Sequence, residues 1–443
     1  EDQFASLGDA VSYEIKIDVV SQGTASDDEI ILIAANEISY VDALDGNDII
    51  TGSANDEEIV GGYGDDIIDG GAGNDIIRDN FGTNVLTGGA GNDIFDLTGT
   101  NNPSGTIDGG TGTDTLKISG NADLSALEII GDSIEKIDGN NANVTTDISK
   151  FTELGISQLE NMTLTLPSNE RDGELDISTV SGDVNLRGTT GSDTLIGNDN
   201  KNIIYLIGDR DSDLWAGEQK GQDTAVAGGG NDQIRLETGW DWQHTFSAVD
   251  QQNKTYLLLG DFDGGNGNDT FVLDFRYHDF SHAWGGGTWS ENADTWTLDL
   301  SSATLVNIER LELLGSTDPN RPNRSPVEIG LSLQQINEVS TFAGINRVSI
   351  KGGGQLDIQA IKDKGILSWR IADDADYDIV GTDSSESISL QGGNNDIELA
   401  GGNDSVTLQN IASANGNLDG GAGVDTLKIN GQVIDLSAAT VSN

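Results

Sequence analysis

The sequence contains no cysteine among its 443 residues, so disulfide bonds cannot stabilise the fold, and cysteine-based catalysis or metal binding is excluded. Proline occurs only five times beside 59 glycines, a ratio that fits neither collagen nor a low-complexity linker. No apolar run reaches the roughly 18–20 residues that a membrane-spanning helix needs. We therefore expect no transmembrane segment and a specific structural purpose for the glycines.

Positive charge is also scarce. The chain has 22 basic residues against 75 acidic ones, which gives a formal net charge of -53. A compact state with this charge repels itself unless cations neutralise it. Nucleic acid and anionic membrane surfaces are therefore poor partners, and polyvalent cations are better ones.

The glycines and acids recur with a period of nine. Residues 43–96 divide without a gap into ALDGNDIIT, GSANDEEIV, GGYGDDIID, GGAGNDIIR, DNFGTNVLT and GGAGNDIFD. The first six positions of each nonapeptide are rich in turn-forming residues, for which glycine supplies positive φ at little cost. The last three positions predict a short strand, with the eighth residue pointing inward at Ile50, Ile59, Ile68, Ile77, Leu86 and Phe95.

The sixth position of each nonapeptide is an acid or an amide. If two nonapeptides form one coil, the sixth positions stack in two columns, Asp48–Asp66–Asn84 and Glu57–Asp75–Asp93. Successive coils of a parallel solenoid lie about 4.8 Å apart, so these carboxylates repel unless a cation lies between them. Ca²⁺ suits such turns better than Mg²⁺, because it accepts six to eight oxygen ligands in tolerant geometry.

This phrase resembles the RTX nonapeptide repeat, GGxGxDxUx. The best matches are GGYGDDIID (61–69), GGAGNDIIR (70–78) and GGAGNDIFD (88–96), whereas Glu57 and Asn84 depart from the phrase and predict weaker or incomplete sites. The resemblance implies a parallel β-roll with calcium between stacked turns, held by the sixth-place acid and by carbonyls of the glycine-rich positions. In the tandem block those positions are Gly61, Gly62, Gly64, Gly70, Gly71, Gly73, Gly88, Gly89 and Gly91.

A longer repeat encloses the short one. GGTGTDTLKISG, GGNGNDTFVLD and GGAGVDTLKING begin at residues 109, 264 and 420, and DLSALEIIGDSIEKIDG (123–139) aligns with DLSSATLVNIERLELLG (299–315). The isolated phrases and their weaker relatives add metal-ligand candidates: Asp114, Asp193, Asp232, Gly264, Gly265, Gly267, Asp269, Asp396, Asp404, Gly420, Gly421, Gly423 and Asp425.

The whole pattern predicts an all-β fold, a right-handed parallel β-roll or β-solenoid with loop insertions and short helices at 147–155 and 331–342. We expect lead-in strands over 1–42, the nonapeptide β-roll over 43–108, and a first long unit over 109–263. A second long unit over 264–419 carries an aromatic insertion at 275–296, and 420–443 is a terminal cap or the start of a third unit.

The insertions that flank the second long phrase hold five of the seven tryptophans, including Trp240, Trp242, Trp284 and Trp289. Exposed, they would form a ligand patch within 237–296 for sugar rings or a neighbouring protein, whereas buried they would form a small satellite core. His278 and His282 have a spacing that could hold a transition metal, against which stands a hydrogen-bonded or solvent-facing pair.

Catalytic motifs are missing. The sequence has neither an H-E-x-x-H helix nor a G-x-S-x-G elbow, and calcium explains its aspartates, so we expect no enzyme. The resemblance is strongest to non-enzymatic bacterial S-layer proteins and large RTX adhesins. It implies type I secretion without an N-terminal signal, in agreement with the start EDQFASLGDAVSYEIK, followed by folding on calcium outside the cell.

Three functions remain open at this point. The first is an extracellular structural protein of the bacterial cell surface, partnered by other copies of itself. The second is an adhesin or carbohydrate-binding module that holds a surface polysaccharide, and the third is the scaffold of a polysaccharide-modifying enzyme.

Overall fold

The computed structural model divides the chain into two compact units, Glu1–Val144 with Ser149–Glu160, and Thr145–Ile148 with Asn161–Asn443. The structure describes residues 19–33, 38–100, 102–130, 133–145, 156–166, 173–189, 192–207, 223–237, 247–250, 255–258, 260–274, 297–314, 328–345, 347–366, 368–409, 415–430 and 436–442. The domain boundaries expected from the sequence stay a prediction.

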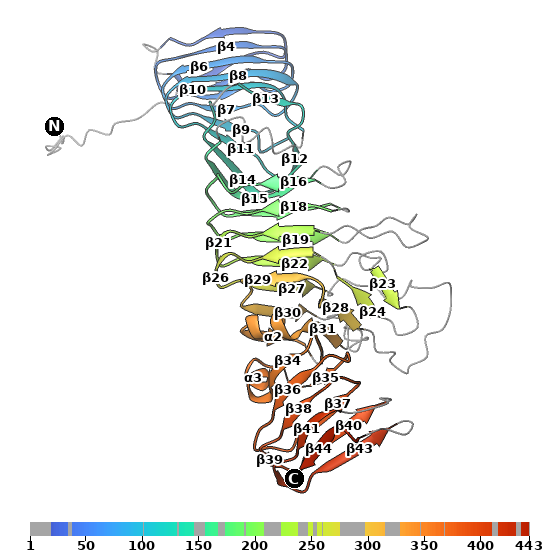
Figure 1. Cartoon of the computed structure of the whole chain (residues 1–443). Helices are drawn as coiled ribbons and strands as arrows, with labels where there is room; N and C mark the ends of the chain where they lie inside the picture. The colour runs from blue at the N-terminus through green and yellow to red at the C-terminus, as the bar shows by residue number, and fades with distance from the viewer. Residues whose placement is uncertain are drawn as a thin grey trace, which may run out of the picture. The chain divides into compact units, whose positions relative to one another are not determined.

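Two parallel sheets build the first unit, and the chain alternates between them so that each coil adds one strand to each sheet (Figure 1). The first sheet consists of β1 (Val19–Gln22), β3 (Ile38–Asp42), β5 (Glu58–Val60), β7 (Ile76–Arg78), β9 (Ile94–Asp96), β11 (Thr115–Lys117) and β14 (Lys136–Thr145), with β12 (Asn121–Asp123) beside β14. The second consists of β2 (Glu29–Ile31), β4 (Ile49–Ser53), β6 (Ile67–Ala72), β8 (Thr83–Ala90), β10 (Ser104–Thr111) and β13 (Leu127–Ile129). The predicted parallel β-solenoid is confirmed.

The eighth residues of the nonapeptides form the core between these sheets. Ile50, Ile68 and Leu86 are register partners on β4, β6 and β8, and Ile59, Ile77 and Phe95 are register partners on β5, β7 and β9. All six are at most 3% exposed. Because burial of such a side chain contributes about 1.5–3 kcal/mol, this apolar column stabilises the stack wherever the phase of the repeat is kept.

The second unit continues with parallel strands. One sheet contains β17 (Val184–Arg187), β19 (Ile203–Ile207), β22 (Gln233–Glu237), β27 (Thr270–Asp274), β30 (Arg310–Leu314) and β32 (Thr341–Ala343), with β15 (Gln158–Thr165) beside β17. A second contains β16 (Glu174–Asp176), β18 (Thr194–Ile196), β20 (Asp223–Val226), β25 (Gly260–Asp263) and β29 (Thr304–Val306), and β21 (Gly229–Gly230) pairs with β26 (Asn266–Gly267).

Further along, β24 (Thr255–Leu257), β28 (Thr297–Asp299), β31 (Glu328–Ser332), β33 (Val348–Lys351) and β35 (Trp369–Ile371) form a parallel sheet, to which β23 (Ser247–Asp250) adds antiparallel. The last sheets are β34 (Gly354–Asp357), β36 (Tyr377–Val380), β38 (Asp396–Glu398), β41 (Gly416–Asp419) and β44 (Ala439–Ser442); β37 (Ser387–Leu390), β40 (Ser405–Gln409) and β43 (Thr426–Asn430); and β39 (Gly401–Gly402) with β42 (Ala422–Gly423).

Within the described residues of this unit, two short helices interrupt the strands. Helix α2 (Leu333–Glu338) confirms the helix expected within 331–342 and begins with a capping box, in which Ser332 and Gln335 bond each other's backbone N–H. Helix α3 (Ile358–Asp363), capped by Asp357, was not predicted. The helix expected at 147–155 lies outside the described residues. Among those residues no helix has the length and apolar character to cross a bilayer.

Candidate metal sites

The sixth-place acids of the first unit form two hydrogen-bonded ladders. In each ladder one carboxylate oxygen accepts the backbone N–H of the sixth residue in the preceding coil, as Asp75 Oδ1 does from Glu57 at 2.8 Å. The first ladder runs through Asp28, Asp48, Asp66 and Asn84, and the second through Glu57, Asp75, Asp93, Asp114 and Glu135. The two columns expected from the nine-residue period are therefore present.

The second oxygen of these carboxylates has no hydrogen-bond partner although it is buried. This holds for Oδ2 of Asp48, Asp66, Asp75, Asp93 and Asp114 in the first unit, and of Asp232, Asp269, Asp404 and Asp425 in the second. All but Asp425 are at most 2% exposed. An ionised carboxylate buried in this way is costly unless a proton or a cation compensates it.

Where the turn opens with glycine, this oxygen faces that glycine, as it does for Asp66, Asp75, Asp93, Asp114, Asp269 and Asp425. A Cβ added at Gly70 would lie 2.7 Å from Asp75 Oδ2 and 2.7 Å from the carbonyl oxygen of Gly88 in the next coil. The space that glycine leaves free is thus bordered by one carboxylate oxygen and one carbonyl oxygen. The same acid lies within 3.0 Å of the absent Cβ at Gly61, Gly70, Gly88, Gly109, Gly188, Gly264 and Gly420.

This donor set fits calcium. Within the described residues no three His, Asp or Glu side chains converge as a metal-binding group, so most ligands of an ion in these turns would be backbone carbonyls or water. Oxygen-only coordination with many neutral carbonyls is what Ca²⁺ accepts. The residues present would therefore hold calcium, which when bound would neutralise the buried carboxylates.

Without a cation these carboxyls hold protons unusually well. Burial, followed by the charges of Asp93 and Glu57, raises the pKa of Asp75 to about 7. Burial also raises the pKa of Asp232 to about 7 and of Asp114 to about 6, with a further contribution from the negative neighbours of each. The pKa values of Asp48, Asp66, Asp93, Asp269 and Asp404 are raised in the same direction by burial.

The other glycines of the phrase pack backbone against backbone. Gly64 and Gly91, for example, have φ of 138° and 139°, a conformation that side-chain-bearing residues rarely adopt. A carbonyl oxygen of the preceding coil would lie within 2.3 Å of a Cβ added at each of these glycines: Gly62, Gly64, Gly71, Gly73, Gly89, Gly91, Gly265, Gly267, Gly421 and Gly423.

Not every candidate acid adopts this arrangement. Asp193 uses both oxygens within its turns, Oδ1 for the N–H of Gly173 at 3.0 Å and Oδ2 for the N–H of Thr189 at 2.6 Å. Glu57 is buried, and the backbone and hydroxyl of Ser53 bond its two oxygens. The regular arrangement is therefore absent at both positions.

Asp396 is exposed at the start of β38, where it accepts the N–H of Asn417 at 2.9 Å. The buried place beside it belongs to Asn395, which accepts the N–H of Tyr377 at 3.0 Å. The role of Asp396 as a metal ligand, like the roles of the other candidates, stays a prediction.

Sequence reasoning missed Asp28, which begins the first ladder, and three further acids at such turns. Glu135 and Glu309 accept the N–H groups of Asp114 and Asp269 through Oε2, each at 2.7 Å, and thereby end their ladders. They occupy the same place in the aligned segments that contain SIEK and NIER, which was the available signal. Asp79 stands in the first position of its nonapeptide, where neighbouring repeats have glycine. Trp240, Trp242, Trp284, Trp289 and the histidines lie outside the described residues.

Replacement of Gly70 by alanine tests whether the space that this glycine leaves free holds a calcium ion. The new methyl would occupy the position between Asp75 Oδ2 and the Gly88 carbonyl, so we expect Gly70→Ala to bind one calcium ion fewer per chain. Equilibrium dialysis counts the ions. Gly401→Ala is the matched control, because its Cβ would meet no atom closer than 3.5 Å. An unchanged ion count in Gly70→Ala would contradict the assignment.

The comparison with protein families agrees with this geometry. The model of the RTX calcium-binding nonapeptide repeat (4 copies) matches residues 42–77, 60–95, 69–102, 181–212 and 220–242. The first three segments cover both ladders from Asp48 to Asp93, and the last two include Asp193 and Asp232. No curated protein and no solved structure matches the chain.

Proposed function

Because the chain carries RTX calcium-binding nonapeptide repeats, we propose that it is an extracellular structural protein of the bacterial cell surface that folds and assembles on binding Ca²⁺. Proteins with such repeats are typically secreted. In this proposal the chain leaves the cell unfolded by type I secretion and takes up calcium outside, where it joins copies of itself in a layer or matrix. The proposal includes no catalytic step.

The observation that carries the proposal is the row of buried, unpartnered carboxylate oxygens. At low calcium each of them opposes folding, because an ionised carboxylate leaves water without a compensating partner. At millimolar calcium, sites of the affinity usual for extracellular modules fill, and the binding free energy becomes folding free energy. The same acids thus keep the chain unfolded during export and stabilise it afterwards.

An exposed apolar ladder on the first unit supports assembly. Ile49, Ile67 and Val85 are register partners on β4, β6 and β8 and are 46%, 48% and 43% exposed. Nearby in the sequence, the rings of Tyr63 and Phe81 stack with centroids 4.3 Å apart, and both side chains are exposed. A second copy of this acidic chain could approach such a surface once calcium has reduced the net charge.

The test is sedimentation and negative-stain imaging without calcium and at about 5–10 mM calcium. We expect monomers without calcium and ordered assemblies with it. The triple variant Ile49→Thr, Ile67→Thr and Val85→Thr should bind calcium normally but assemble at several-fold higher protein concentration. A matched control replaces the exposed strand residues Val306, Val380 and Val441 by threonine. A calcium-loaded chain that stays monomeric at every concentration would contradict the structural role.

A further inference from the structure

The nonapeptide at 79–87, DNFGTNVLT, departs from the repeat at Asp79, Asn80 and Asn84, and two of these changes concern charge. Asp79 stands first, where the neighbouring repeats have glycine, and Asn84 stands sixth, where they have aspartate. The turn therefore keeps one negative charge but carries it at a different position. This shift of the charge matters because the first and the sixth positions of the nonapeptide both border the space in which a metal ion would bind.

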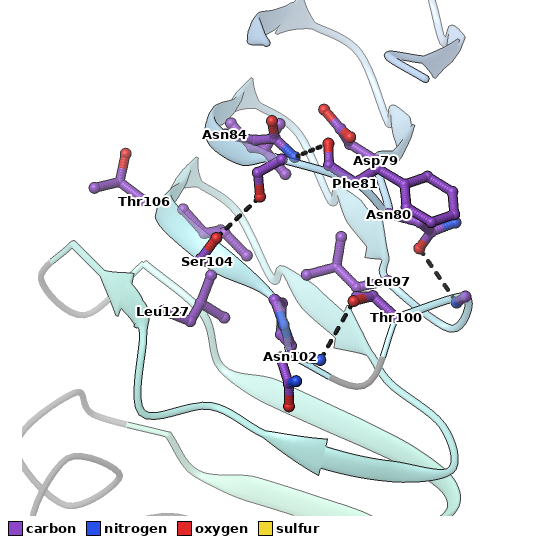
Figure 2. Close-up of a pocket in the computed structure, with 15 residues that line it drawn as sticks. Asp79, Asn80, Phe81, Asn84, Leu97, Thr100, Asn102, Ser104, Thr106 and Leu127 are labelled. Atoms are coloured by element: carbon purple, nitrogen blue, oxygen red, sulfur yellow. Dashed lines mark hydrogen bonds between the residues drawn. The ribbon is translucent and has the colours of Figure 1, made fainter. Parts of the chain in front are cut away.

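Asn84 preserves the ladder but removes the free oxygen. Its Oδ1 accepts the N–H of Asp66 at 3.0 Å, as an aspartate in this place would. Its Nδ2 donates to the carbonyl of Phe81 at 3.3 Å, so the second arm of the side chain is a donor and cannot bind a cation. The ladder of Asp48 and Asp66 ends here, beside a cavity of about 440 Å³ that Asp79 and Asn84 border (Figure 2).

Asp79 places a carboxylate beside the turn one coil earlier, which begins at Gly61. A Cβ added at Gly61 would lie 2.5 Å from Asp79 Oδ2 and 2.7 Å from Asp66 Oδ2. At Gly70, in the other column, the equivalent space is bordered by Asp75 Oδ2 and a backbone carbonyl. A carboxylate oxygen thus takes the place that a neutral carbonyl has in the regular turns.

The protein compensates this pair of acids only in part, since Asp66 Oδ1 accepts the N–H of Asp48 at 2.7 Å. Asp79 is 3% exposed and Asp66 1% exposed, and Asp66 Oδ2 and both oxygens of Asp79 have no hydrogen-bond partner. The adjacent basic residue, Arg78, is engaged elsewhere, with Glu58 and with Asp96 at 3.1 Å. Two buried carboxylates that face one small space need a divalent cation more than a single carboxylate does.

We infer that Asp66 and Asp79 form a calcium site of distinct composition, with two carboxylates where the regular turns offer one carboxylate and one carbonyl. The inference rests on the proposed calcium-dependent folding. It adds Asp79 as a ligand and an order in which the sites fill. Because calcium affinity increases with the number of charged ligands, this site fills before the regular ones and orders the first ladder from its end at Asn84.

The experiment measures calcium binding by the full chain with calorimetry and equilibrium dialysis. Asp79→Asn is expected to lose the tightest calcium ion or to bind it at least about tenfold more weakly. Asp69→Asn removes the same charge from an exposed position of the preceding coil, which contains Asp66, and should bind as the wild type does. Asp79→Gly returns glycine to the first position of the nonapeptide, so it should fold and convert the tight site into an ordinary one, with the ion count unchanged.

Hydrogen exchange supplies a second readout. During calcium titration of the wild type, the amides of residues 61–66 should gain protection at lower calcium than those of 70–75, and Asp79→Gly should abolish this order. Wild-type binding with no difference between Asp79→Asn and Asp69→Asn would overturn this inference alone. Absence of calcium binding by the wild type would instead overturn the proposed function.

Discussion

Removal of calcium at about pH 8, where the raised pKa values of its buried acids no longer keep them protonated, is expected to unfold the first unit of this protein. Buried carboxylates there, namely Asp48, Asp66, Asp75, Asp79, Asp93 and Asp114, each have at least one oxygen without a partner. At 10 mM calcium a site with a Kd of 10⁻⁴–10⁻³ M stabilises the folded state by about 1.4–2.7 kcal/mol. Several such sites together equal the roughly 5–15 kcal/mol by which ordinary domains are stable. Far-UV circular dichroism with and without a chelator should therefore show loss of most β-sheet signal from this unit.

The second unit contains an internal control for this experiment. Between its calcium-type turns, the acids are compensated by the chain's own cations: Lys351 bonds Asp299, Arg370 bonds Glu328 at 2.6 Å, and Lys362 bonds Glu386 at 3.0 Å. Lys364 Nζ also donates to three carbonyls at the end of α2, at 2.6–2.8 Å. These ammonium and guanidinium groups supply the positive charge that a metal ion would supply in the calcium-type turns.

Hydrogen exchange should therefore distinguish the two regions. In chelator, amides of 43–114 are expected to exchange within the dead time, whereas those of β31, β33 and β35 stay measurably protected. If the protein without calcium kept the same exchange pattern and the same Tm as the calcium-loaded protein, the ions would have no structural role.

Much of the first unit could be predicted because the repeat keeps its phase. Once Ile50, Ile68 and Leu86 are assigned to one buried row, the coil length, the parallel pairing and the two columns of acids follow. Helix α3 could not be predicted in this way. Its six residues, IQAIKD, are too few to show a helical period, and the partners of Lys362 and Lys364 lie 24–28 residues away in the sequence.

The metal sites were predictable in position but not in detail. The nine-residue phrase identifies the sixth-place acid, yet it does not say whether both of its oxygens are already used. Asp193 and Asp75 occupy the same place in their turns, but Thr189 satisfies the second oxygen of Asp193 and nothing satisfies that of Asp75. That difference depends on how each turn closes in space.

The stability of the protein without calcium is expected to fall as the pH rises from about 4 to about 8. The pKa values of Asp75, Asp79 and Asp232 are raised to about 7, 8 and 7, mainly by burial, above the ordinary value of 3.8. In this window the unfolded chain has released the protons that the folded chain retains. Each such group therefore lowers the free energy of unfolding by at most about 1.4 kcal/mol per pH unit.

Calcium should reverse this dependence, because the ion replaces the proton between the same oxygens. Binding releases protons below pH 8, so calcium affinity rises with pH, and the calcium-loaded protein should be at least as stable at pH 8 as at pH 5. Denaturant melts at pH 4.5, 6 and 8 measure both curves on protein freed of calcium by dialysis, since chelators titrate in this range themselves. Asp75→Asn should flatten the calcium-free curve, whereas Asp69→Asn, at an exposed position, should not. A calcium-free protein that became more stable between pH 5 and pH 8 would mean that these carboxyls are ionised and compensated without the metal.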